Sequence, residues 1–119
     1  MRHWREGRVR AVERIADATE ADARVLDHLA KLGCDPSEPR ECRHYVYVAA
    51  EPGARALAGE LNGDDGWFAD CEQVRDSWLV TATTFMGLTD DLVRATRVRL
   101  ERLASDHGGE YDGWEAAAD

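Results

Sequence analysis

Apolar residues recur at helical spacing in three segments of the chain. The first lies between residues 19–22, which have the sequence of a capping box, and Gly33, which suits a helix end. The second begins near Pro52, a favourable residue in a first helical turn, and the third follows Thr89, a potential N-cap. The predicted apolar stripes are Val25, Leu26, Leu29 and Leu32; Ala54, Leu57, Ala58 and Leu61; and Leu92, Val93, Thr96, Leu100, Leu103 and Ala104, with Arg94, Arg97 and Arg102 on the other side.

β-Branched and aromatic residues predict four strands. The first covers residues 41–49, after a connector that contains Pro36 and Pro39. Residues 67–74 and 77–84 are separated only by Arg75-Asp76, which predicts an antiparallel hairpin. The last strand contains Tyr111 and Trp114 and runs to residue 116. A helix followed by the order β-α-β-β-α-β predicts an α+β fold, the ferredoxin-like two-layer sandwich (α-βαββαβ), with an antiparallel sheet covered by helices on one face.

Side chains alternate between the two faces of a strand, so the sequence also predicts which residues face the helices. Cys42, His44, Val46 and Val48 form one set on the first strand, and Trp67, Ala69 and Cys71 form the matching set on the second. The other face then carries Tyr45, Tyr47 and Phe68. These aromatics suit a protein-docking patch, a homodimer interface or a platform for stacked bases, unless the N-terminal segment covers them.

The charge of the chain weighs against nucleic acid. The net charge is -9, yet residues 1–15 hold five Arg and two Glu, so the remaining residues carry ten basic and twenty-two acidic side chains. Nucleic-acid affinity comes largely from Lys and Arg that displace counterions, whereas an acidic surface attracts basic proteins. We therefore expect a protein partner, no direct contact with nucleic acid and, since no apolar run reaches the length of a membrane span, no contact with a membrane.

With 119 residues the chain is expected to form one domain, at residues 19–116. Residues 1–18 are a basic N-terminal extension in which Val12, Ile15 and Ala16 fall on one helical stripe. No apolar segment follows the first arginines, so the cytoplasm is the expected compartment. Three widely spaced cysteines, Cys34, Cys42 and Cys71, indicate free thiols.

Catalytic and metal-binding patterns are weak in this sequence. Cys42 and His44 lie two residues apart on one strand face, but a buried thiol with a hydrogen-bonded imidazole explains them better than a nucleophile and base or a pair of metal ligands. The acidic turn at residues 63–66 lacks the ligand spacing of a calcium loop. We expect no enzyme activity, no cofactor and no metal.

Three segments resemble the RraB family of ribonuclease E regulators: the run DPSEPR at 35–40 leading into HYVY at 44–47, WLVTAT at 78–83, and EYDGWEA at 110–116. The resemblance implies a two-layer sandwich and a non-catalytic protein that binds ribonuclease E, or a related RNA-processing nuclease, and inhibits it by protein contact. The candidate contact residues are chosen from their charge and predicted exposure and not from the resemblance. They are the acidic residues Glu51, Asp64, Asp65, Asp70 and Glu72 and the apolar anchors Tyr45, Tyr47 and Phe68.

A second reading of the same fold remains open. Many ferredoxin-like domains pair their sheets as homodimers and bind a small molecule between them, and the aromatics of the open face suit that use equally well.

Overall fold

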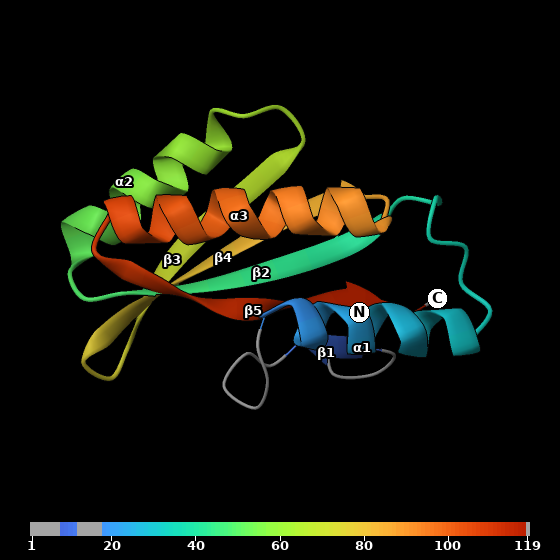
Figure 1. Cartoon of the computed structure of the whole chain (residues 1–119). Coiled ribbons are helices and arrows are strands. Elements are labelled where there is room, and N and C mark those ends of the chain that lie inside the picture. The colour runs from blue at the N-terminus through green and yellow to red at the C-terminus, as the bar shows by residue number, and fades with distance from the viewer. Residues whose placement is uncertain (1–7, 12–17, 119) are drawn as a thin grey trace.

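The structure is a computed structural model that describes residues 8–11 and 18–118 (Figure 1). The elements in chain order are β1 (Arg8–Ala11), α1 (Ala18–Lys31), β2 (Arg40–Val48), α2 (Glu51–Asn62), β3 (Trp67–Val74), β4 (Ser77–Met86), α3 (Asp90–Asp106) and β5 (Gly109–Ala117).

The strands form one antiparallel sheet in the order β1-β5-β2-β4-β3. Strands β2–β5 and helices α2 and α3 give the β-α-β-β-α-β order, so the predicted α+β sandwich is confirmed. The β3–β4 hairpin turns at the two predicted residues, and Arg75 adopts a positive φ of 55° there. Buried residues of all three helices join one core with one face of the sheet. The other face is the open face described below.

Strand β1 differs from expectation. A helical extension was predicted over residues 9–18, but Arg8–Ala11 form a strand that pairs with β5, with Val9 opposite Ala116. The sequence of β1 alternates arginine with an apolar residue, which is compatible with a strand. Without β1, β5 would present an edge of unpaired backbone N–H and C=O groups. That edge is built by the last residues of the chain, so the local pattern could not reveal it. The predicted stripe itself, Val12, Ile15 and Ala16, lies outside the described residues.

The predicted core faces of the strands are confirmed. Cys42, His44, Val46 and Val48 are between 0 and 3% exposed, and Ala69 is also buried. Trp67 and Cys71 pack against the core from its margin. In α2 all four predicted residues are buried: Ala54, Leu57, Ala58 and Leu61.

Three expectations for the other helices are corrected. Helix α1 begins at Ala18, so residues 19–22, the predicted capping box, lie inside the helix. The Asp22 carboxylate does not cap the helix but accepts hydrogen bonds from side chains of α3 and β5. In α3, Leu92 is 48% exposed whereas Arg97 is only 6% exposed, the reverse of the predicted faces. Leu32 follows the end of α1 and is exposed. The predicted cap is confirmed, since Thr89 accepts a hydrogen bond from Leu92 N.

A bulge in β5 places both of its large aromatics in the core. Tyr111 and Trp114 are three residues apart and would point to opposite faces of a regular strand. However, Trp114 lies opposite His44 while Tyr111 lies opposite Val46, so β5 contains one residue more than β2 in this interval. Gly113 supplies the left-handed backbone, with φ 101°. Both aromatics are consequently at most 4% exposed.

Candidate functional site: the open face of the sheet

The open face is built by residues that alternate with the core residues of β2–β5. Directly opposed residues of antiparallel strands lie on the same face, so the registers define neighbours across the sheet. Thr83 lies between Arg43 and Phe68, Thr81 between Tyr45 and Asp70, and Leu79 between Tyr47 and Glu72.

Large aromatic side chains on this face are exposed to solvent. Tyr47 is 37%, Phe68 63% and Phe85 69% exposed, while Tyr45 is half-buried. Phe85 was missed from the sequence because the predicted strand ended at Thr84, whereas β4 continues to Met86. Extending the alternation by one residue would have found it.

Carboxylates surround these aromatics. Glu41, Asp70, Glu72, Glu110 and Glu115 all lie on the open face, by alternation or by register. Along β2–β5, which the structure describes completely, Arg43 is the only cation on this face. Arg43 Nε lies 3.6 Å from Glu41 Oε2, and the Tyr45 hydroxyl donates to Glu115 Oε2 at 3.2 Å. The part of the face built by β2–β5 is therefore strongly acidic, while Arg10 of β1 pairs opposite Glu115 at its edge.

A shallow hollow of about 520 Å³ lies on the face over β3 and β4. Its lining includes Arg43, Phe68, Asp70 and Glu72, so it presents one cation, one exposed ring and two carboxylates. An open hollow of this kind suits the side chains of a docked protein better than an enclosed small molecule.

Five of the eight nominated residues come together on the open face: Tyr45, Tyr47, Phe68, Asp70 and Glu72. The other three do not. Glu51 begins α2 and accepts a bond from Arg55 Nε at 2.6 Å. Asp64 lies in the turn before β3 and forms an ion pair with Arg99 at 2.7 Å, and Asp65 is exposed beside it. Strand β1 pairs at the edge of the sheet, so its backbone does not cover the face.

The comparison with protein families identifies the chain. A family profile described as "Regulator of ribonuclease activity B" matches residues 19–116, which is most of the sequence. The chain belongs to the RraB family. The family description names regulation of ribonuclease activity, and a search of curated proteins finds no significant match. Along the described part of this RraB chain, no helix is long and apolar enough to cross a membrane.

The predicted thiol and imidazole pair is buried in this RraB domain. Cys42 is 0% and His44 3% exposed, and the Cys42 thiol donates to the backbone oxygen of Arg40 at 3.5 Å. His44 Nδ1 and the Tyr111 hydroxyl share a hydrogen bond of 2.8 Å. Burial, and secondarily the charge of Arg97, lowers the pKa of His44 to about 3. All three cysteines are free thiols, and the described residues contain no group of three side chains arranged as metal ligands.

Beneath the sheet, a buried ion pair joins α1 to α3. Arg97 Nε and Nη2 donate to the two carboxylate oxygens of Asp22 at 2.8 and 2.6 Å, and Trp114 Nε1 donates to Asp22 at 2.9 Å. The Arg97 guanidinium also lies 5.0 Å from the centre of the Tyr111 ring. These contacts explain why Arg97 is buried, and they indicate that the cluster of Asp22, Arg97, Tyr111 and Trp114 has a structural role.

Proposed function

We propose that this chain binds a ribonuclease E-type nuclease and inhibits it by protein contact through the open face of its sheet. The observation that carries the proposal is the combination of exposed aromatics with surrounding carboxylates on a single face. Family membership supports a regulatory role in ribonuclease activity.

The two kinds of residue serve different parts of binding. Exposed rings such as Phe68 and Phe85 bury large apolar areas and supply anchors. The carboxylates attract basic segments over a distance and fix the orientation of docking. RNA-binding segments are rich in Arg and Lys, so an acidic face that occupies them competes with RNA for the same cations.

The same face is a poor platform for RNA itself. Recognition of single strands on a four-stranded sheet combines stacking with cationic neighbours, whereas on β2–β5 of this sheet Arg43 is the only cation among five carboxylates. We also propose no catalytic role, because the buried Cys42 and His44 do not reach solvent. The proposed action is occupancy of a protein surface.

Titration of a purified ribonuclease E-type enzyme with this protein tests the proposal. The charge-reversed variant D70K/E72K and the anchor variant F68S are compared with E38K, which reverses a charge on the exposed connector before β2. We expect D70K/E72K and F68S each to weaken binding about tenfold or more, and E38K to bind like the parent. Binding of the parent should also weaken as salt rises from 50 to 500 mM.

Two results would contradict the proposal. If the protein does not bind the ribonuclease E-type enzyme at low salt, this enzyme is not its partner. If binding is unaffected by salt and by D70K/E72K, the acidic face is not the binding site. Inhibition is read separately, from cleavage of a short RNA by the same enzyme, and should fall in parallel with binding across the variants.

The alternative function, a dimer that binds a small molecule between paired sheets, would use the same aromatics. Sedimentation of the parent and of F68S separates the two. A stable dimer that dissociates on loss of Phe68 supports the alternative, whereas a monomer that still binds the nuclease supports regulation by docking.

A further inference from the structure

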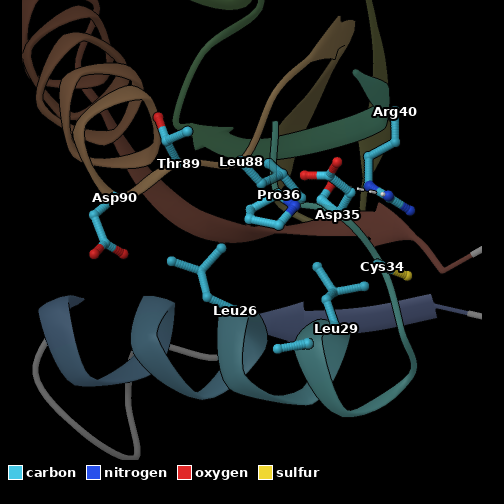
Figure 2. Close-up of a pocket in the computed structure, with 10 residues that line it drawn as sticks. Leu26, Leu29, Cys34, Asp35, Pro36, Arg40, Leu88, Thr89 and Asp90 are labelled. Atoms are coloured by element: carbon cyan, nitrogen blue, oxygen red, sulfur yellow. Dashed lines mark hydrogen bonds between the residues drawn. The ribbon is translucent and has the colours of Figure 1, made fainter. Parts of the chain in front are cut away.

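A second surface lies on the helix side of the sheet and shares no residue with the open face. It is a pocket of about 340 Å³ between α1 and the connector that leads into β2 (Figure 2). Leu26 and Leu29 of α1, Pro36 of the connector and Leu88 supply most of its apolar lining. The Leu88 N–H donates to the Pro36 oxygen at 2.7 Å, which fixes the connector against the segment after β4.

Volume and lining fit a small-molecule site. Ligand pockets in proteins span roughly 300–1,000 Å³ and combine apolar walls with a few polar groups. Here the polar groups are Asp35, Arg40, Thr89 and Asp90. In Figure 2, Asp35 and Arg40 lie together at one end of the pocket, while Thr89 and Asp90 lie at the other.

Arg40 is a buried cation without a carboxylate partner. It is 7% exposed, its Nη1 donates to the backbone oxygen of Ala117 at 3.0 Å, and its Nη2 donates to the backbone oxygen of Asp35 at 3.5 Å. Its Nε has no hydrogen-bond partner, and no carboxylate of the described residues lies within ion-pair distance. The carboxylate of Asp35 accepts hydrogen bonds from Ser37 N and Oγ, and these bonds, with a smaller contribution from the charge of Arg40, lower the pKa of Asp35.

Arg97, the other buried arginine of the described residues, has the carboxylate partner that Arg40 lacks. Arg97 is buried to the same degree and is neutralised by Asp22 through two short hydrogen bonds. A buried charge that only backbone carbonyls solvate is costly, because removal from water is not balanced by an opposite charge. The Arg40 guanidinium therefore lacks a directly bonded anion, because the Asp35 carboxylate at the same end of the pocket is bonded to Ser37 and acts on Arg40 only through its charge.

We propose that this pocket binds a small apolar carboxylate, with the carboxylate group against Arg40 and the apolar body between Leu26, Leu29 and Leu88. Guanidinium and carboxylate groups match in geometry and form strong charge-assisted bonds. Arg40 sets the orientation of the ligand, because the far end of the lining offers the Asp90 carboxylate and no cation, whereas the Asp35 carboxylate near Arg40 is already bonded to Ser37. The space is sufficient for about ten water-sized groups, which is the size of an aliphatic acid of medium chain length.

Titration of the full chain with sodium octanoate, followed by ¹H–¹⁵N NMR, tests this proposal. Octanamide has the same body without the charge and is the matched ligand control. R40M keeps the apolar stem and removes the charge, and R43M removes a neighbouring cation that faces the other side of β2. A third variant, A30F, fills the pocket from α1 and leaves Arg40 intact.

We expect saturable octanoate binding with a Kd of about 1 mM or below, with shifts at the backbone of residues 26–36 and 88–90. Octanamide should bind at least about tenfold more weakly, and R40M and A30F should lose octanoate binding while R43M keeps it. If R40M does not fold, the comparison of octanoate with octanamide and the A30F variant still decide the question. Equal binding of the two ligands, equal binding by R40M and the parent, or no saturable binding overturns the proposal.

Discussion

His44 provides a test of how strongly the core of this protein depends on burial. Its imidazole is enclosed by the rings of Trp67, Tyr111 and Trp114, with centroids 5.6, 6.0 and 6.1 Å away. Burial first, and the nearby positive charge of Arg97 second, lower its pKa from 6.5 to about 3. The folded protein therefore holds His44 neutral throughout the mildly acidic range.

The direction of the resulting pH dependence follows from linkage. Below pH 6.5 the unfolded chain binds a proton at His44 that the folded chain does not bind until about pH 3. The contribution to stability is fully present above pH 6.5 and is lost as pH falls toward the folded pKa. Well below pH 6.5 each pH unit lowers the free energy of unfolding by about 1.4 kcal/mol, so on the order of 2 kcal/mol disappears between pH 6.5 and 4.5. That is a large part of a typical total of about 5–15 kcal/mol.

Urea unfolding at several pH values, applied to the parent and to H44Q, isolates this contribution. Glutamine does not titrate, so the gap in stability between parent and H44Q should shrink by on the order of 2 kcal/mol on going from pH 6.5 to 4.5. H28Q removes an exposed imidazole of α1 and should follow the parent at each pH. Parallel curves for the parent and H44Q would refute the reasoning, because they would mean that the folded state accepts the proton.

Three further predictions concern stability and are read from urea unfolding at neutral pH. Gly53→Ala should destabilise the fold, because the added Cβ would lie 2.6 Å from the backbone oxygen of His107. Gly59→Ala in the same helix meets open space and should stabilise the fold by about 0.5–1 kcal/mol. Equal effects of the two substitutions would contradict the close contact between Gly53 and His107. Asp22→Leu should cost about 3–5 kcal/mol by leaving the Arg97 charge unpaired, and adding Arg97→Met should recover part of that loss, while a further additive loss would argue against the ion pair. Gly113→Ala should cost about 1 kcal/mol or more because alanine is strained at φ 101°, and a neutral effect would exclude the glycine-dependent bulge in β5.

Much of the fold was predictable because its signals are local. Alternation along β2 assigned each residue to a face, the two residues Arg75-Asp76 fixed the hairpin, and Pro52 and Thr89 marked the starts of two helices. Such signals depend on backbone geometry within a few residues, so they need no knowledge of the rest of the chain. For the candidate site, the same alternation placed Tyr45, Tyr47 and Phe68 on one face.

The remaining features depended on partners that are distant in sequence. Arg97 has a polar position in its own helix and is buried only because Asp22 meets it there, 75 residues away. Strand β1 forms along an edge that β5 provides, and the charge of Arg40 is notable only because folding buries it without a directly bonded carboxylate. The sequence by itself determined the elements and the faces of the strands, since these follow from local periodicity. The tertiary structure alone decided which charges are paired, which edges are covered and where a pocket remains, because those outcomes depend on how distant segments meet.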